Sequence, residues 1–295
     1  MKMATPSIFS LLNPLRFNAL HYNSITHAWI HIFGDNFHFG YFSSPNTSLD
    51  EATDALIDKM AVFGELSEKA KVLDVGCGIG APAFYLHRKF GCDVTGISTS
   101  DIGVHNAEEE SKKRGYRDSV RFRVANGLDN GFADNTFDVV WVMESSHLMK
   151  DKRKLLAECH RVLKPGGVML LCDIMWRRPY TIADRFGYLL RLKSDFIVGA
   201  FDHIRSFGLV HMETFDTYIN TARQIGFDDV KLIDISEQAV PTFERWKANI
   251  AANEARILQT LTARQMKGFM QAADFSKDIF ERKIGGYGIL KALKR

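Results

Sequence analysis

Three closely spaced glycines are the first residues whose pattern suggests chemistry. The apolar run Lys71–Val75 leads directly into Gly76-Cys77-Gly78-Ile79-Gly80, after which a helical pattern begins. Glycine lets the backbone turn tightly and approach a ligand closely, and the first turn of the following helix carries partial positive charge. The spacing differs from the GxGxxG fingerprint of dinucleotide-binding domains. The segment therefore predicts a ligand-binding turn between a strand and a helix.

A second reactive group follows the buried apolar run at Phe137–Met143. The residues Glu144-Ser145-Ser146-His147 come directly after it, and functional groups of open α/β sheets gather at the carboxyl ends of strands. Glu144 could stabilise a developing positive charge or remove a proton. A histidine titrates near neutral pH, so His147 could deprotonate a hydroxyl. The alternatives are a loop-anchoring or ligand-contacting role for Glu144 and a backbone hydrogen bond for His147.

Two further segments carry polar groups among aromatic residues. The N-terminal 50 residues hold four histidines, at positions 21, 27, 31 and 38. We expect no metal site there, because no group of carboxylates accompanies the histidines. Residues 177–212 intersperse arginines with aromatic and aliphatic side chains. Such an insert could bind an anionic head group and an apolar tail, or it could form a solvated lid helix or an interface.

The elements that must position these groups alternate along the chain. Apolar runs predict strands at 71–75, 93–97, 120–124, 137–143, 168–173, 229–235 and 287–293. Helical spacing is present at 50–68 with Asp50 as its N-cap, and at 81–90, 102–114, 152–163, 214–225 and most of 237–272. Strands alternating with helices predict a parallel sheet covered on both faces.

Composition excludes several classes of protein. The 295 residues are 46% hydrophobic and 25% charged, with a formal net charge of +3. This balance and the lack of a basic run argue against nucleic acid, and no stretch is apolar enough to span a bilayer. The four cysteines form no CxxC pair. Reduced thiols and a cytoplasmic location are therefore expected.

The glycine-rich turn resembles the first motif of the class I S-adenosylmethionine (SAM)-dependent methyltransferases. Two more segments resemble this family in order and spacing, Asn130–Val140 before the fourth strand and Cys159–Gly167 before the fifth. The resemblance implies a Rossmann-like α/β fold with a mostly parallel seven-stranded sheet and helices on both faces. It further implies a helical cap at 1–50 and a SAM-binding domain at 51–295, with a helical lid inserted after the fifth strand at about 177–212.

The resemblance also implies a set of cofactor contacts. Asp74 and the glycines would surround the methionine part of SAM, and Asn126 stands where an Asp usually contacts the adenine amine, which an amide oxygen could also do. The second strand ends in Gly96–Ser100 without the acidic residue that commonly holds the ribose. The expected cofactor-binding residues are Tyr22, Asp74, Gly76, Cys77, Gly78, Gly80, Ser98, Thr99, Asn126, Gly127, Leu128 and Glu144.

The turn at Gly96–Ser100 is similar to that of the tocopherol methyltransferase and cyclopropane synthase subgroup. Residues 34–41 resemble the H-x-G-[YF] segment of tocopherol, sterol and related methyltransferases, which closes over SAM and the acceptor. The expected catalytic residues are Glu144 and His147. The expected acceptor-binding residues are His38, Tyr41, Arg177, Arg178, Tyr180 and Arg185, and the acceptor is a small, largely apolar molecule such as a prenyl diphosphate.

The leading hypothesis is C-methylation of an isoprenoid alkene, whose carbocation aromatic faces and Glu144 could stabilise. The alternatives are O- or N-methylation of a phenol, sugar or amine with His147 as base, and a SAM-binding protein without chemistry. A nucleic-acid methyltransferase is disfavoured, since neither a catalytic Cys motif nor an Asp/Asn-Pro-Pro-[Tyr/Phe] motif follows the fourth strand. A homodimer built through the insert is also compatible with the sequence.

Overall fold

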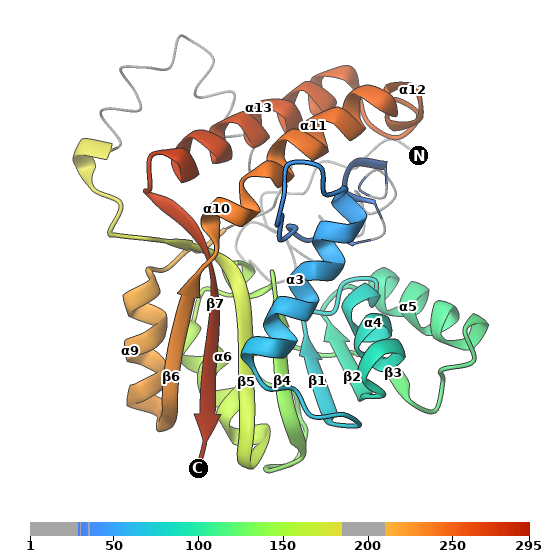
Figure 1. The fold of residues 1–295 in the computed structure, drawn as a ribbon. Coiled ribbons are helices and arrows are strands. Elements are labelled where there is room, and N and C mark those ends of the chain that lie inside the picture. The colour runs from blue at the N-terminus through green and yellow to red at the C-terminus, as the bar shows by residue number, and fades with distance from the viewer. Residues whose placement is uncertain (1–28, 30, 35, 185–209) are drawn as a thin grey trace, which may run out of the picture.

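The computed structural model describes residues 29, 31–34, 36–184 and 210–295. Its centre is a seven-stranded sheet in the order β3-β2-β1-β4-β5-β7-β6 (Figure 1). The strands are β1 (Lys71–Val75), β2 (Asp93–Ser98), β3 (Val120–Val124), β4 (Phe137–Met143), β5 (Leu163–Trp176), β6 (Phe227–Asp234) and β7 (Gly285–Lys294). Only β7 runs antiparallel to its neighbours β5 and β6, so the predicted fold class is confirmed.

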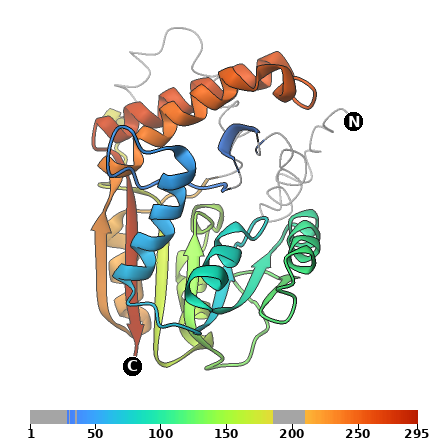
Figure 2. The same ribbon diagram turned by 45° about the vertical axis from the view of Figure 1, so that its right-hand side comes forward.

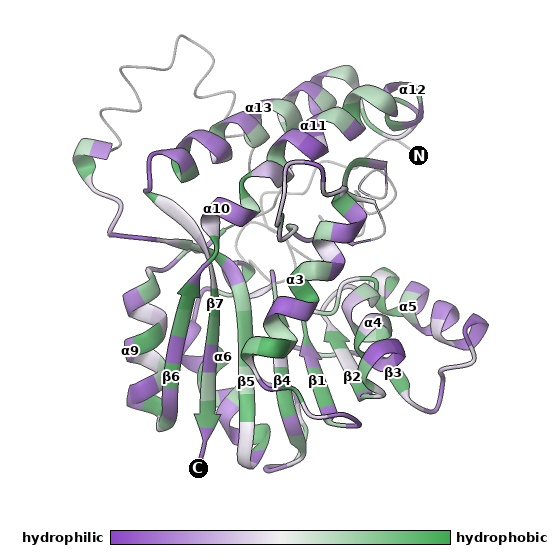
Figure 3. Ribbon diagram, in the orientation of Figure 1, coloured by the Kyte–Doolittle hydropathy of each residue, from purple (hydrophilic) through white to green (hydrophobic). Residues whose placement is uncertain are grey.

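Helices cover both faces of this sheet. On one face, α3 (Leu49–Phe63), α4 (Ala81–Phe90) and α5 (Asp101–Lys113) share a single apolar core with the strands. On the other face, α6 (Lys152–Val162) and α9 (Phe215–Ile225) form a second core. In Figure 3 these helices alternate between hydrophilic and hydrophobic colours along their length, as expected of helices that bury one side.

A helical layer lies over the carboxyl ends of the parallel strands. It consists of α10 (Ser236–Ala239), α11 (Pro241–Ala252), α12 (Glu254–Ile257) and α13 (Ala263–Glu281). Figures 1 and 2 both show α11 and α13 crossing above the sheet. This layer covers the edge at which the glycine turn and the residues after β4 lie.

Several expected boundaries need correction. Ser48 rather than Asp50 caps α3, because its side chain accepts a hydrogen bond from the Glu51 amide and Glu51 bonds back to the Ser48 amide. That helix ends at Phe63, five residues earlier than expected. β5 begins at Leu163 instead of Val168, since Pro165-Gly166-Gly167 lies in an irregularity of the β4–β5 ladder rather than in a loop.

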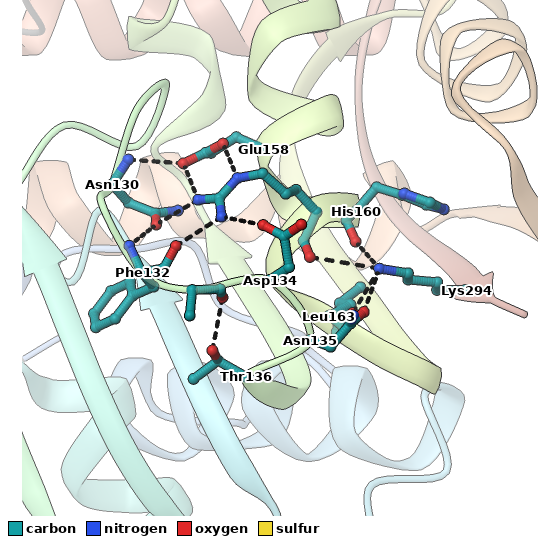
Figure 4. A network of polar contacts seen from close by, with 11 residues as sticks. Asn130, Phe132, Asp134, Asn135, Thr136, Glu158, His160, Leu163 and Lys294 are labelled. Carbon is teal, nitrogen blue, oxygen red and sulfur yellow. Dashed lines mark hydrogen bonds and ion pairs between the residues drawn. The ribbon is translucent and has the colours of Figure 1, made fainter.

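The opposite edge of the sheet is tied together by charged side chains (Figure 4). Arg161 at the end of α6 contacts Glu158 and Asp134, each at 2.7 Å, and the Phe132 carbonyl at 2.6 Å. Lys294 of β7 donates to the carbonyls of His160 and Leu163. These contacts join the segment before β4 to the ends of α6 and β7.

The predicted division into a cap at 1–50 and a domain at 51–295 with a lid remains a prediction. Tyr22, Arg185 and most of both helical segments lie outside the described residues. Within the described part of the chain, no helix is long and apolar enough to cross a bilayer. That same part contains no cluster of His, Cys, Asp or Glu with the makings of a metal site.

Candidate active site

A cavity of about 900 Å³ opens at the carboxyl edge of the sheet. Its wall includes the glycine turn, the ends of β2 and β4, and aromatic side chains from the helical layer. The predicted residues that line it are His38, Gly76, Cys77, Gly78, Ser98, Thr99, Asn126, Gly127, Glu144, His147 and Tyr180. One cavity therefore brings together residues predicted for both the cofactor and the acceptor.

The glycine turn has the geometry that its sequence predicts. Gly76, Gly78 and Gly80 all have positive φ, of 87°, 54° and 87°, a region that other residues rarely adopt. A Cβ on Gly76 would lie 2.1 Å from the Ser145 Cβ, whereas one on Gly78 would meet nothing within 4 Å. The turn is thus packed against the β4 segment on one side and leaves its backbone accessible on the other. Gly80 caps α4 without a side-chain hydrogen bond, and Pro82 in the first turn has no N–H, so few amides of that helix end need a partner.

Asp74 is buried in β1, just before this turn. Its side chain is 2% exposed, and its Oδ2 has no hydrogen-bond partner within the described residues. Burial raises the pKa of this carboxyl to about 7, because a charge is costly where water is excluded. A buried acceptor without a partner is unusual in a folded protein. It fits a ligand that carries a cationic or N–H group, as the ammonium of SAM does.

Asn126 and Ser98 frame the same side of the cavity with local turns. The Asn126 Oδ1 accepts the Leu128 amide at 3.0 Å, which leaves that oxygen one lone pair and the amide nitrogen for a ligand. The Ser98 Oγ accepts the Ser100 amide at 3.2 Å. Gly127 packs closely, since a Cβ there would lie 2.7 Å from Val75. Small polar groups and backbone therefore form this wall. No acidic side chain contributes from Gly96–Ser100, as the sequence indicated.

Glu144 adopts a strained conformation at the end of β4. Its φ is 46°, which is uncommon for a residue with a Cβ and often marks a functional site. The carboxylate accepts hydrogen bonds from the Phe39 amide at 2.6 Å and from the Tyr287 hydroxyl. Burial raises its pKa to about 8, against the lowering effect of these two bonds. Glu144 thus joins the N-terminal segment, β4 and β7 at the cavity wall.

His147 is held by a carboxylate that the sequence did not reveal. The His147 Nδ1 lies 2.7 Å from Oδ1 of Asp173, near the end of β5, and the His147 amide donates to Oδ2 at 2.9 Å. The Ser146 hydroxyl also donates to Oδ2, at 2.5 Å. Burial would raise the pKa of Asp173, but its contacts with His147 and Ser146 lower it below the usual value. Asp173 is therefore an ionised partner for the imidazole.

Asp173 fixes which imidazole nitrogen is free. Because an ionised carboxylate only accepts hydrogen bonds, Nδ1 of His147 carries the proton and Nε2 keeps its lone pair. The residue lines the cavity, and because Nδ1 is bonded to Asp173, Nε2 is the ring nitrogen that can act on a bound ligand. The arrangement is that of a general base oriented by a carboxylate.

His38 also has its Nδ1 bonded to the protein, but to a backbone carbonyl rather than to a carboxylate. Its Nδ1 lies 2.8 Å from the Phe39 carbonyl, which can only accept, so Nε2 again holds the lone pair. Burial lowers the His38 pKa to about 4, and Nε2 lacks a partner among the described residues. His38 is thus a neutral hydrogen-bond acceptor rather than a base.

The remaining predicted acceptor residues are not all at the cavity. Tyr180 lines it and stacks on Trp176 with ring centroids 4.9 Å apart. Arg177 pairs with Asp234 at 2.5 Å, and Arg178 pairs with Asp184 through two bonds of 2.7 Å. Tyr41 lies under the ammonium of Lys59 and is not among the described residues that line the cavity.

Sequence reasoning missed Asp173 and Tyr287, and only Asp173 had a signal in the sequence. Asp173 lies near the carboxyl end of an apolar strand, β5, and the neighbouring strand β4 leads into His147. A supporting acid is expected at that edge of the sheet. Tyr287 lies near the start of β7, but its approach to Glu144 depends on β7 inserting antiparallel beside β5, which no local pattern predicts. Asp74, Gly80 and Leu128 are not among the described residues that line the cavity.

Comparison with known proteins agrees with this geometry. Residues 73–171 match the family model described as "Methyltransferase domain". The chain is 31% identical over 265 residues to Methyltransferase GfsG of Streptomyces halstedii, covering 89% of this chain and 88% of the relative. It is 30% identical over 234 residues to the chloroplastic tocopherol O-methyltransferase of Arabidopsis thaliana, covering 75% and 65% of the two chains.

A solved cyclopropane synthase of Mycobacterium tuberculosis has the same fold. Its TM-score is 0.81 at 17% identity, over 94% of this chain and 97% of that one. The described cavity fits the cofactor of the family, because the accessible glycine turn lies in its wall and an unpartnered carboxylate, Asp74, is buried just before that turn. The chain is therefore a member of the SAM-dependent methyltransferases of the small-molecule type, with SAM as its cofactor.

Proposed function

We propose that the protein methylates a hydroxyl oxygen of a bulky, largely apolar small molecule, with His147 as general base. The observation that carries this proposal is the Asp173 carboxylate bonded to both the Nδ1 and the amide of His147. A hydroxyl is a poor nucleophile until it loses its proton, whereas an alkene has no proton to lose. A base oriented in this way therefore favours O-methylation over C-methylation.

The chain's own groups would carry out the proton transfer. His147 Nε2 accepts the hydroxyl proton as the oxygen attacks, and Asp173 stabilises the imidazolium that forms. SAM supplies an electrophilic methyl on its sulfonium, and the products are a methyl ether, S-adenosylhomocysteine and the proton. Alignment of the oxygen with the methyl is the other main contribution of the protein.

The cofactor-binding roles remain proposals that the cavity supports. Asp74 and the backbone of Gly76 and Gly78 would hold the methionine part, with the ionised Asp74 carboxylate facing its ammonium. Thr99 and Ser98 would face the ribose, and Asn126 with Gly127 and Leu128 the adenine. Binding a cation would lower the pKa of Asp74 from its raised value of about 7.

The acceptor would occupy the aromatic part of the cavity. Apolar rings contributed by several elements line it, including Trp29, Phe33, Phe37, Phe243, Trp246 and Phe280. Rings of this size favour a large apolar acceptor. His38 would then receive a hydrogen bond from a second donor on the acceptor, because its Nε2 is a fixed lone pair. Likewise, Tyr41 and the arginines at 177, 178 and 185 remain predictions, as do the homodimer and the cytoplasmic location.

The test is methyl transfer with matched histidine variants. Methyl-labelled SAM would be incubated with a panel of phenols, macrocyclic alcohols, amines and prenyl diphosphates, and products read by mass spectrometry. We expect label on oxygen, with His147→Gln about a thousandfold slower and the exposed His105→Gln unchanged. Full activity of His147→Gln would reject the base. Binding of SAM with no labelled product from the panel would favour a SAM-binding protein without chemistry.

The second candidate is C-methylation of an isoprenoid alkene. Buried Glu144 beside the Tyr287 hydroxyl, among aromatic rings, could stabilise a carbocation. Arg177 and Arg178 do not strengthen this second candidate, because each already pairs with an aspartate. Label on a carbon of a prenyl diphosphate, lost in Glu144→Gln and kept in His147→Gln, would favour this candidate.

A further inference from the structure

Lys152 is a lysine buried beside the base. It is the first residue of α6 and is 5% exposed, a rare location for an ammonium group. Its Nζ donates to three backbone carbonyls, those of Ser146 at 2.7 Å, His211 at 2.6 Å and Met149 at 2.5 Å. An ammonium has three donors, so all of its hydrogen-bonding capacity is directed at backbone.

The three carbonyls surround the turn that carries His147. The Ser146 carbonyl belongs to the peptide bond that precedes His147, and the Met149 carbonyl follows the short 3₁₀ turn at Ser146–Leu148. His211 lies on a separate segment whose amide donates to the His147 carbonyl at 2.7 Å. Lys152 thus connects both ends of the His147 turn to a second wall of the cavity.

Retaining a charge at this position is unfavourable in itself. Burial lowers the pKa of Lys152 to about 8, although Asp173 and Glu213 act in the opposite direction. An apolar residue at the start of α6 would avoid that cost. Neighbouring Lys154 is exposed, as is usual for lysine. The buried ammonium therefore calls for a role that an apolar side chain cannot fill.

We propose that Lys152 is a positioning residue, which locks the Ser146–Met149 turn so that the His147 imidazole stays bonded to Asp173. This inference rests on the proposed function, in which His147 is the base. The His147 ring reaches Asp173 from a short turn whose own backbone has few internal bonds. Three additional bonds from one side chain restrict the rotation of that turn, and a base displaced by about 1 Å loses much of its effect.

The test follows the His147 Nδ1 proton by NMR in the full-length protein with S-adenosylhomocysteine, using ¹⁵N-labelled histidine. His147→Gln assigns the signal. In Lys152→Met, which keeps the length and removes the donors, we expect exchange of this proton with water to accelerate at least about tenfold. Lys152→Gln, which retains two N–H donors, should recover part of the protection. The matched control is Lys154→Met on the same helix, which should leave the proton unchanged.

Unchanged exchange and chemical shift in a folded Lys152→Met would overturn the proposal. Folding is checked by circular dichroism, and if Lys152→Met does not fold, the same criterion applies to Lys152→Gln. The outcome is independent of turnover. An active His147→Gln would reject the proposed base while the effect of Lys152 on the Nδ1 proton could still be observed, so the two failures are distinguishable.

Discussion

Polar side chains at the two edges of the sheet differ in whether their hydrogen-bonding groups have partners. At the amino edge, Arg161 and Lys294 are matched by carboxylates and carbonyls (Figure 4). At the carboxyl edge, Asp74 and His38 are buried with atoms that lack partners in the described residues. Unsatisfied buried groups cost stability, whereas satisfied networks do not. The comparison indicates that one edge is organised for stability and the other for ligands.

The largest expected effect tests the carboxyl edge through Asp173. Asp173→Asn keeps the shape but permits the amide to donate, so His147 no longer has a fixed tautomer. We expect kcat to fall about a thousandfold while the Kd of SAM changes less than about twofold. Initial rates of methyl transfer would give kcat, and calorimetry would give the Kd of SAM. If Asp173→Asn weakened SAM binding as strongly as it lowered kcat, Asp173 would act on the fold instead.

Asp74→Asn separates ligand binding from stability at the same edge. Without the negative charge, the Kd of SAM should rise about a hundredfold, because a charged hydrogen bond of ~1.5–3 kcal/mol is lost. The ligand-free variant should be more stable at pH 8 than the wild type, since it buries no carboxylate. Calorimetric binding and thermal unfolding measure both. A weaker affinity accompanied by lower stability would contradict the comparison.

Arg161→Met tests the amino edge. Its loss leaves Glu158 and Asp134 without their shared cation, and we expect the free energy of unfolding to fall by about 2 kcal/mol. The Kd of SAM and kcat should stay within about twofold of wild type. Urea unfolding provides the measurement, and the exposed Arg153→Met is the control. A large change in kcat would mean that the two edges are not independent.

The expected effect furthest from turnover is a pH dependence of the stability of the ligand-free protein. The pKa values of Asp74 and Glu144 are raised from 3.8 and 4.5 to about 7 and about 8. The folded protein therefore holds protons that the unfolded chain has lost, and their contribution to stability falls as pH rises from 5 to 8. We expect the free energy of unfolding to decrease by roughly 5 kcal/mol over this range. Asp74→Asn/Glu144→Gln should flatten this slope, and an unchanged slope would rule out both groups.

The sequence predicted the parts of the site that depend on local pattern. The turn at Gly76–Gly80 follows from glycine spacing, and the alternation of strands and helices along the chain follows from hydrophobic periodicity. The contacts of Glu144 with Tyr287 and of Lys152 with His211 join residues far apart along the chain. They depend on tertiary packing, for which one sequence holds no local signal. The paired arginines at 177 and 178 could not be foreseen for the same reason.

The place of β7 in the sheet has a consequence for biosynthesis. β7 is the last strand along the chain, yet it lies between β5 and β6 and pairs with both. Until residues 285–294 are available, β6 has no partner in the sheet, β5 has only β4, and the Glu144 carboxylate lacks the Tyr287 hydroxyl. Long-range pairing of this kind forms late and leaves strand edges exposed to aggregation in the meantime. A nascent chain would therefore complete its sheet and its cavity in one step, once β7 has emerged from the ribosome.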